Sequence, residues 1–318
     1  METRHIGSLQ VSIVGLGCNN FGWRLDLERT RQVVEAALGA GITFFDTADM
    51  YGGTRSEEFL GQALAGRRDT VVLATKFGWR IDDERPGGAS PRYLRQAVED
   101  SLRRLATDRI DLYQLHKPDP LTPIGETLAV LDELVRAGKV REIGCSNFSV
   151  EQLREARAAV REGAARFVSV QNQYSLLHRD PERGVLQECE RESLAFLPFF
   201  PLASGLLSGK YRRGAPDPGT TRLTATASMK ERFLTARNRV AAEALAEFAA
   251  ARGHTLLELA FSWLASHRAV ASVIAGAMSP EQVRANAAAA GWRLSADELA
   301  EVDRLAPLGD RVPPDDSR

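Results

Sequence analysis

The stretch TFFDTADMYGG, from Thr43 to Gly53, joins a short apolar run to a loop that carries a carboxylate and a phenol. The run ends at Asp46, and Tyr51 follows five residues later between small and turn-forming residues. An apolar run of this length, bounded by turn signals, is typical of a buried strand. The pattern therefore predicts a strand over 43–46 that presents polar side chains at one edge of a sheet.

Seven further short apolar runs follow the same pattern along the chain. They are Ser12–Gly17, Thr70–Lys76, Ile110–His116, Arg141–Asn147, Phe167–Tyr174, Leu194–Phe200 and Val270–Gly276. The segments between the runs, such as LERTRQVVEAALGAG from Leu27, have helical periodicity, and several end on glycine. Ser90-Pro91 predicts a helix N-cap followed by proline in the first helical position, and Thr122-Pro123 repeats that pattern.

Eight buried strands that each lead into a helix predict an α/β fold, the (β/α)8 TIM barrel, rather than an open sheet. A small hairpin near Arg4–Val11 is expected to cap the bottom of the barrel, and extra helices, one near Ala296–Leu305, are expected in the C-terminal part. Insertions at 78–89 and 203–239, the second of which contains the turn-rich segment GAPDPGTTRLTATAS, should overhang the C-terminal mouth. No linker rich in Pro, Gly or Ser divides the chain, which predicts a single domain over residues 1–318.

The composition of the 318-residue chain favours a small or neutral partner. It holds 41 Lys and Arg residues against 42 Asp and Glu residues, so it lacks the basic surface that nucleic acids or anionic membranes require. The N-terminus has no signal-peptide pattern, and no apolar run is long enough for a spanning helix. We therefore expect a soluble cytoplasmic protein that binds neither nucleic acid nor membrane.

The sequence predicts no metal site. Cys18, Cys145 and Cys189 are scattered without CxxC spacing, which favours buried thiols in a reducing compartment. The histidines that lie outside the apolar runs have no carboxylate or cysteine at ligand spacing, and they are expected to be structural or exposed. These are His5, His178, His254 and His267.

Polar residues end five of the predicted strands. They are Asp46, Lys76, His116, the pair Ser146 and Asn147, and Gln171. Barrel enzymes build their sites from the C-terminal ends of the strands and the loops that follow, so these side chains should converge. Each residue alone would more often be a cap, a packed ring or a surface group. Their joint placement favours a functional site.

The predicted set can protonate a carbonyl that is becoming an alkoxide. Tyrosine, with an ordinary pKa of about 10, is a poor acid at neutral pH, but an adjacent ammonium lowers that pKa. Lys76 supplies the ammonium next to Tyr51, Asp46 keeps it charged and oriented, and His116 hydrogen-bonds the carbonyl oxygen. No side chain delivers hydride, so a cofactor must supply it.

Other residues suit a nicotinamide cofactor. Ser146, Asn147 and Gln171 can hold a carboxamide, and Phe199 offers an aromatic face to a flat ring. GAMSPEQVRAN, residues 276–286, combines a glycine, a turn and a helix N-terminus, which together favour a phosphate site. No GxGxxG follows the first strand, so a Rossmann mode of binding is not expected.

Seven motifs occur in one order over roughly Ile13 to Asn286, and through them the chain resembles the aldo-keto reductase family. They are DTADMYGG, LATKFG, YQLHKPDP, IGCSNF, VQNQYS, FFPLASGLLSGKY and GAMSPEQVRAN. The resemblance implies a catalytic tetrad of Asp46, Tyr51, Lys76 and His116, in which Tyr51 is the general acid. It implies hydride transfer from a nicotinamide cofactor that binds extended across the barrel mouth, in an enzyme of class EC 1.1.1.

The resemblance also implies the remaining binding residues. For the cofactor they are Gly17, Asp46, Ser146, Asn147, Gln171, Phe199, Pro201, Leu202, Gly205, Lys210, Arg222, Gly276, Met278, Gln282 and Asn286; for the substrate they are Trp23, Tyr51, Trp79 and His116. Many NADPH-preferring members have Arg, Lys or Ser at the position of Met278, and methionine cannot pair with a 2′-phosphate. Arg284 or Arg222 can compensate. NADPH is therefore the expected cofactor, and NADH stays possible.

The expected activity is the reversible reduction of aldehydes or ketones to alcohols. The alternative from another class is a nucleotide-sensing regulatory subunit, because the potassium-channel beta subunits resemble this fold; they typically carry Asn where this chain has His116, which favours an enzyme. A sugar-specific dehydrogenase or ketoreductase and a broad aldehyde reductase both stay open. The sequence determines neither the physiological substrate nor the oligomeric state.

Overall fold

A computed structural model gives the structure of the protein, and it describes residues 1–211, 219, 221, 223–224 and 227–309. Eight parallel strands form one sheet in the order β10-β3-β4-β5-β6-β7-β8-β9. Their bounds are β3 Val14–Gly17, β4 Phe44–Asp46, β5 Val72–Phe77, β6 Ile110–Leu115, β7 Val140–Ser146, β8 Phe167–Gln173, β9 Ala195–Phe199 and β10 Val273–Gly276. Each lies within one of the eight predicted runs or within one residue of it.

The barrel is nearly closed between its first and last strands in the sheet order. β9 and β10 share no ladder; instead the segment before β10 pairs with Phe196, which donates its N–H to Ala269 O at 2.7 Å and accepts one from Ala271 N at 3.0 Å. This is why the predicted last strand, Val270–Gly276, begins as β10 only at Val273. With helices between the strands, the architecture confirms the predicted (β/α)8 barrel.

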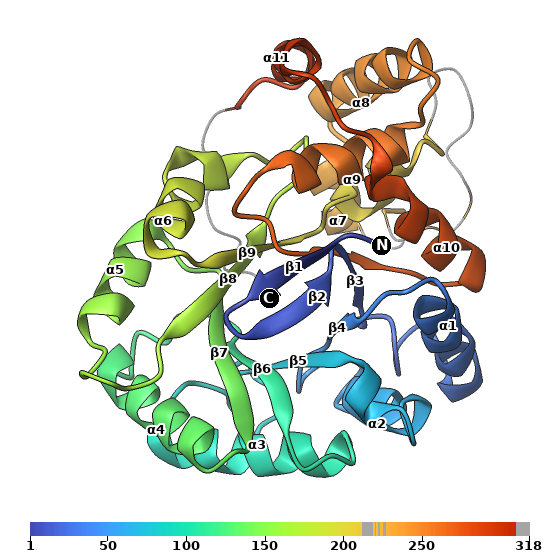
Figure 1. Cartoon of the computed structure of the whole chain (residues 1–318). Helices are drawn as coiled ribbons and strands as arrows, with labels where there is room; N and C mark the ends of the chain where they lie inside the picture. The colour runs from blue at the N-terminus through green and yellow to red at the C-terminus, as the bar shows by residue number, and fades with distance from the viewer. Residues whose placement is uncertain (212–218, 220, 222, 225–226, 310–318) are drawn as a thin grey trace.

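Helices surround the strands (Figure 1). They are α1 Leu27–Gly39, α2 Arg55–Ala63, α3 Pro91–Arg104, α4 Ile124–Arg136, α5 Val150–Ala158, α6 Val185–Glu192, α7 Ala227–Phe233, α8 Ala236–Ala250, α9 Leu256–Ser266, α10 Pro280–Ala288 and α11 Ala296–Leu305. Ser90 caps α3 as predicted, with Pro91 in the first turn. The predicted cap at Thr122 is wrong: α4 begins one residue later than expected, and the Thr122 hydroxyl donates to Asp119 Oδ2 at 2.7 Å.

The stretch predicted as an insertion, 203–239, contains helices that were not predicted at these positions. They are α7 and the first residues of α8. The Thr235 hydroxyl caps α8 by accepting from Asn238 N at 3.1 Å, a helix start signal that the sequence analysis did not use. The final helix, α11, has the predicted bounds and lies beside α8 at one side of the molecule (Figure 1).

An N-terminal hairpin closes the bottom of the barrel, as predicted. Its strands are β1 Thr3–Ile6 and β2 Leu9–Ser12, and in Figure 1 they lie across the near end of the barrel. Apolar side chains of the hairpin pack against inward-facing residues of the strands; these are Ile6, Leu9 and Val11 against Phe44, Ala74, Leu112, Leu197 and Ile274. The hairpin therefore completes the apolar core in the lower half of the barrel.

Polar contacts fix the hairpin in place. Arg4 donates to three main-chain oxygens at the end of α9 and beyond it, those of Ala265 at 2.6 Å, His267 at 3.2 Å and Val270 at 2.5 Å. At the hairpin turn, Ser8 N donates to Glu142 Oε1 on β7 at 2.7 Å. The guanidinium satisfies carbonyls that a helix terminus leaves without partners.

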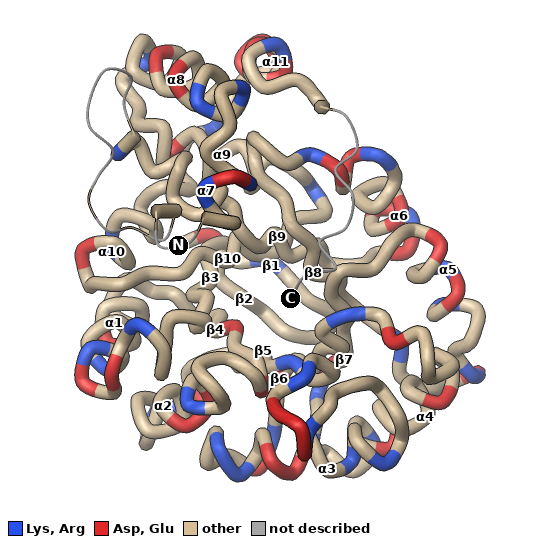
Figure 2. Tube along the Cα trace, turned by 180° about the vertical axis from the view of Figure 1, so that it is seen from behind, with Lys and Arg blue, Asp and Glu red and all other residues tan. Residues whose placement is uncertain are grey.

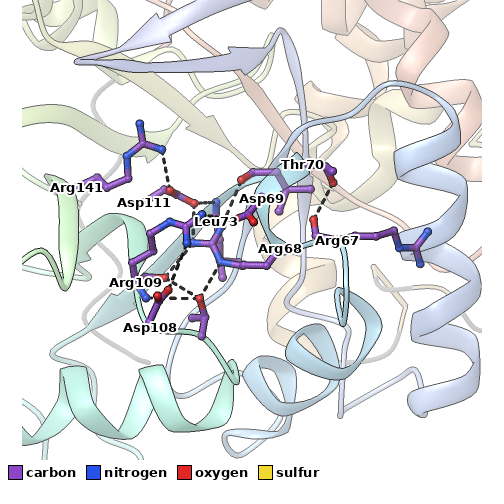
Figure 3. Close-up of polar contacts among 11 residues, drawn as sticks. Arg67, Arg68, Asp69, Thr70, Leu73, Asp108, Arg109, Asp111 and Arg141 are labelled. Carbon is purple, nitrogen blue, oxygen red and sulfur yellow. Dashed lines mark hydrogen bonds and ion pairs between the residues drawn. The ribbon is translucent and has the colours of Figure 1, made fainter.

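A buried carboxylate joins three neighbouring strands near the same end of the barrel (Figure 3). Asp111 accepts from Leu73 N at 2.9 Å and forms ion pairs with Arg68 at 2.8 Å and Arg141 at 3.1 Å. Figure 3 shows the guanidinium groups of Arg68 and Arg141 converging on it. Along the outer helices, basic and acidic residues alternate without a large region of one sign (Figure 2).

Asp111→Ala should lower the free energy of unfolding by about 3 kcal/mol, because it leaves a largely buried guanidinium and a buried N–H without their acceptor. Urea unfolding at neutral pH, followed by circular dichroism, measures the change. Asp108→Ala is the matched control, since Asp108 is 86% exposed in its ion pair with Arg109. Similar unfolding midpoints for the two variants would contradict the structural role given to Asp111.

Candidate active site

An ion pair lies inside the barrel, above the apolar layer. Lys76, the next-to-last residue of β5, donates from Nζ to Asp46 Oδ2 at 2.6 Å and to Thr47 O at 2.8 Å. The Lys76 side chain is completely buried, and Asp46 at the end of β4 is nearly so. The predicted pair is therefore formed, and no water reaches the ammonium.

The second carboxylate oxygen of Asp46 is held by two amides. Gln171 Nε2 on β8 donates to Asp46 Oδ1 at 2.9 Å, and Gln114 Nε2 on β6 donates to it at 3.2 Å. The sequence analysis missed Gln114, although alternation along IDLYQLH places it on the same face as His116. A Cβ at Gly144 would lie 3.3 Å from Gln114 Cγ and collide with the hydroxyl of Ser169, so only glycine leaves room for this amide.

Tyr51 reaches the ammonium from the loop after β4. Its phenol hydrogen-bonds to Lys76, and Lys76 Nζ lies 5.1 Å from the centre of the Tyr51 ring. Gly52 (φ 61°) fits the next position because a Cβ there would lie 2.5 Å from Phe21 O. Burial acts to lower the pKa of Lys76, but Asp46 and Tyr51 outweigh it, so the pKa of Lys76 is raised and the ammonium stays charged.

The imidazole of His116 lies directly after β6, beside the phenol. The rings of Tyr51 and His116 meet edge to face, with centroids 5.8 Å apart, and the Trp79 ring is 5.3 Å from the imidazole. Burial, followed by the charges of Lys76 and Lys117, places the pKa of His116 well below its ordinary value. The imidazole is therefore neutral at physiological pH and has an N–H to donate.

The three residues predicted to hold a carboxamide lie together. The main-chain oxygen of Gln171 accepts from Ser146 Oγ at 2.7 Å and from Asn147 N at 3.0 Å. Asn147 adopts a positive φ of 61° at the end of β7, and its amide donates to His116 O at 3.0 Å. Phe199, the last residue of β9, is half-buried beside Phe200.

The loop after β9 contains Pro201, Leu202, Gly205 and Lys210, while Arg222 lies outside the described residues. Ala203, Ser204 and Gly205 all have positive φ, which turns the backbone sharply after Leu202. A Cβ at Gly205 would lie 3.2 Å from Lys210 Nζ. Lys210 is exposed, although nearby atoms partly desolvate its ammonium and lower its pKa.

The other predicted cofactor residues lie on β3, β10 and α10. Gly17 and Gly276 pair across β3 and β10, next to Asp46, and a Cβ at Gly276 would lie 3.3 Å from the side chains of Asn19 and Asn20. Met278 N donates to Gln282 Oε1 at 2.8 Å, just before α10. Asn286, on α10, is buried, and Arg284, on the same helix, is exposed and 3.7 Å from Glu281.

The two predicted substrate tryptophans differ in position. Trp79 lies against His116, as described above, whereas Trp23 is 60% exposed on the loop after β3. Arg24 covers Trp23, with its guanidinium carbon 4.3 Å from the ring centre. That loop packs on the turn that carries Tyr51, since Gly52 touches Phe21 and Gly22.

A second buried cluster lies on the outer side of the barrel wall, between β5, α2 and α3. Glu57 accepts from the Thr75 hydroxyl and from Arg104 Nε, each at 2.6 Å. Asp49 is buried beside them, and neither of its carboxylate oxygens has a hydrogen-bond partner among the described residues. Burial and then Glu57 place the pKa of Asp49 well above its ordinary value. The sequence carried no signal for this cluster.

The comparisons with known proteins agree with this architecture. The chain matches the Aldo/keto reductase family over residues 13–307. Aldo-keto reductase YhdN of Bacillus subtilis (strain 168) is 35% identical over 93% of this chain and 90% of its own length, and L-glyceraldehyde 3-phosphate reductase of Escherichia coli (strain K12) is 32% identical over 96% and 92%. The solved holo form of aldo-keto reductase AKR11C1 from Bacillus halodurans is 33% identical, with a TM-score of 0.79 and 97% of each chain covered.

A further relative differs from these in its described role. A probable voltage-gated potassium channel subunit beta of Arabidopsis thaliana is 32% identical over 90% of this chain and 90% of its own length. Within the described residues, no helix is both long and apolar enough to cross a bilayer. Nor do three or more His, Cys, Asp or Glu side chains gather as a metal ligand set in that part of the chain.

Asp49→Asn should stabilise the protein more at pH 8 than at pH 5. The unfolded chain ionises Asp49 above a pH of about 4, whereas the folded pKa is raised, so the wild type loses this contribution to stability as the pH rises towards the folded pKa. Melting temperatures at the two pH values give the comparison. Asp69→Asn is the control, because Arg109 lowers the pKa of the exposed Asp69. Asp69 is then ionised in both the folded and the unfolded chain at pH 5 and at pH 8, so the effect of this variant should not differ between the two pH values. A pH-independent difference between Asp49→Asn and wild type would contradict the burial of a neutral acid.

Proposed function

Because the chain belongs to the aldo/keto reductase family, a family of oxidoreductases, we propose that it transfers hydride between NAD(P)H and an aldehyde or ketone, reversibly. The observation that carries the proposal is the hydrogen-bonded series Asp46, Lys76 and Tyr51, with the neutral imidazole of His116 beside the phenol. Such a series suits a proton donor that must become an anion during the reaction and then regain its proton.

In the proposed reduction, Tyr51 donates its proton to the carbonyl oxygen as negative charge develops there. The ammonium of Lys76 stabilises the phenolate left behind, and Asp46 keeps that ammonium charged inside the barrel. His116 donates a ring N–H to the same oxygen and thereby orients the carbonyl. In the direction of alcohol oxidation, the phenolate of Tyr51 accepts the proton.

The residues around the mouth fit a dinucleotide. Lys210 presents an exposed ammonium that would lie 3.2 Å from a Cβ at Gly205, and at Gly17 and Gly276 a Cβ would lie 3.2 Å and 3.3 Å from neighbouring side chains, so glycine keeps the backbone open at both places. Asn20, whose Nδ2 would lie 3.3 Å from a Cβ at Gly276, has a buried Oδ1 without a partner among the described residues. Ser146, Asn147 and Gln171 would hold the carboxamide, and Phe199 would cover the ring. When bound, the reduced nicotinamide supplies the hydride.

NADPH is the proposed cofactor, with Arg284 as the cation for its 2′-phosphate. Arg284 lies on α10, the helix that begins two residues after Met278, and its contact with Glu281 at 3.7 Å is long and exposed. A pair of this kind contributes little to stability and can exchange its partner for a phosphate. NADH is the alternative if the thioether of Met278 excludes the phosphate.

Two alternatives predicted from the sequence are still to be tested, a nucleotide-sensing subunit and a sugar-specific enzyme. A nucleotide-sensing subunit is favoured by the relative described as a channel subunit, but His116 and its ring contacts favour an enzyme. Among enzymes, a sugar-specific activity and a broader aldehyde reductase are distinguished by a panel of sugar, aryl and aliphatic carbonyls assayed with NADPH and NADH. L-Glyceraldehyde 3-phosphate belongs in that panel because an Escherichia coli relative is named as a reductase of this compound.

Tyr51→Phe should lower kcat for aldehyde reduction at least about a hundredfold, because a positioned general acid contributes about 10² to 10⁴ in rate. Affinity for NADPH should stay within about threefold, since the hydroxyl acts in the transition state. Stopped-flow absorbance measures the first quantity and protein fluorescence the second.

Tyr113→Phe is the matched control for that variant. The Tyr113 phenol is buried in the layer between the strands and the helices, and its hydroxyl has no partner among the described residues. Its removal should leave kcat within about twofold. Normal turnover by Tyr51→Phe would reject the assigned acid, and NADPH binding without turnover of any carbonyl by the wild type would favour the sensor.

Met278→Arg should raise the ratio of kcat/KM for NADPH to kcat/KM for NADH about tenfold, because a guanidinium can pair with the 2′-phosphate that a thioether cannot. Arg284→Met should lower the same ratio. Steady-state kinetics with the two cofactors give both values. If neither variant changes the ratio, the adenosine end does not lie at α10.

A further inference from the structure

Lys117 lies beside the proposed reacting groups without belonging to them. Its ammonium is 4.3 Å from the centre of the Trp79 ring. That ring is 5.3 Å from the imidazole of His116, and the imidazole is 5.8 Å from the ring of Tyr51. A continuous series of ring contacts therefore connects the ammonium to the phenol that is proposed to protonate the carbonyl.

Within the described part of the chain, the ammonium of Lys117 forms no ion pair within 4 Å and no hydrogen bond, although its charge helps to lower the pKa of Asp119. Two of the other four lysines form ion pairs, Lys76 with Asp46 and Lys139 with Glu99. The Lys117 side chain is half-buried, and the indole face holds its charged end without using any of its N–H donors. The Trp79 ring thus fixes the position of the ammonium and partly desolvates it, while the N–H groups of the ammonium can still bind an anion.

The nearby carboxylate of Asp119 already accepts three hydrogen bonds from other groups. Its carboxylate accepts from Ala89 N and the Thr122 hydroxyl, each at 2.7 Å, and from Leu121 N at 3.0 Å. The hydrogen bond from Ala89 N joins the loop after β5, which carries Trp79, to the loop after β6, which carries Lys117. Asp119 therefore fixes the cation–indole pair in position through the backbone instead of binding the cation.

The charge of Lys117 also acts at the place where the carbonyl would lie. After burial and Lys76, it is the third cause that lowers the pKa of His116. A cation whose field reaches the imidazole attracts anions to the same part of the mouth.

We propose that Lys117 binds an anionic group of the substrate, a carboxylate or a phosphate, so that the preferred substrates are aldehydes carrying such a group a few bonds from the carbonyl. This inference rests on the proposed function and deepens it by giving a substrate class. With the carbonyl between Tyr51 and His116 and the anion on Lys117, the carbon skeleton would lie along the face of Trp79.

A matched pair of aldehydes tests the inference: 4-carboxybenzaldehyde and its uncharged methyl ester, each assayed with NADPH. Lys117→Met removes the charge and keeps an unbranched side chain on the indole. The ratio of kcat/KM for the acid to kcat/KM for the ester should fall about tenfold in this variant, the equivalent of one lost charge-assisted contact. Lys117→Arg should keep the ratio within about threefold. Lys139→Met removes a lysine on the outer surface and should leave the ratio unchanged.

Salt gives an independent measurement. Between about 0.01 M and 1 M NaCl the Debye length falls from about 30 Å to 3 Å, so the ratio should fall in the wild type but hardly change in Lys117→Met. A wild-type preference for the ester, or a ratio that Lys117→Met leaves unchanged, would overturn the inference. Equal losses on both aldehydes would also overturn it, since Lys117 would then act through His116.

The proposed function and the inference fail in distinguishable ways. Reduction of the ester by the wild type supports the proposed function whatever the acid-to-ester ratio is. If wild-type protein binds NADPH but reduces no carbonyl of the wider panel, the proposed function is overturned and the inference with it. If it reduces other carbonyls but not 4-carboxybenzaldehyde, the inference alone is overturned.

Discussion

An ammonium without access to water can persist inside a barrel only where an opposite charge is held against it. Lys76 and Asp46 meet this condition at 2.6 Å. Gln171 and Gln114 donate to the second oxygen of the carboxylate, and Gly144 leaves room for Gln114. The desolvation cost of two buried charges is offset only when their remaining hydrogen bonds are made. The same enclosure strengthens the field that the ammonium exerts on a neighbouring phenol.

The barrel separates stability from chemistry along its axis. At the bottom, the hairpin and the inward-facing apolar side chains form a continuous core. Asp111 on β6 joins β5 through the N–H of Leu73 and β7 through the guanidinium of Arg141. At the top, the same strands change to polar inward-facing residues within two positions, as from Phe44 to Asp46. The costly buried charges thus stand on a layer that is already rigid, which suits a site in which small displacements matter.

The sequence predicted the barrel and most of the candidate site because both depend on the same local signal, an apolar run that ends in a polar residue. Asp46 and His116 carry that signal at strand ends. Gln114 was missed because it lies inside its run, where only strict alternation shows which way it points. Asp49 was beyond prediction, since its burial depends on a fold that brings Glu57 and its partner Arg104, 47 residues apart, to one place. The helix α7 was missed because its seven residues have no clear apolar period.

The contacts of Arg4 have a consequence for synthesis on the ribosome. Its guanidinium binds carbonyls more than 260 positions later in the chain, at the end of α9 and just before β10. The first two strands to leave the exit tunnel therefore cannot take their final position until almost every other element has emerged. During translation the half-made barrel has an open lower end and an unpaired edge at β3, which are surfaces that bind chaperones or other nascent chains.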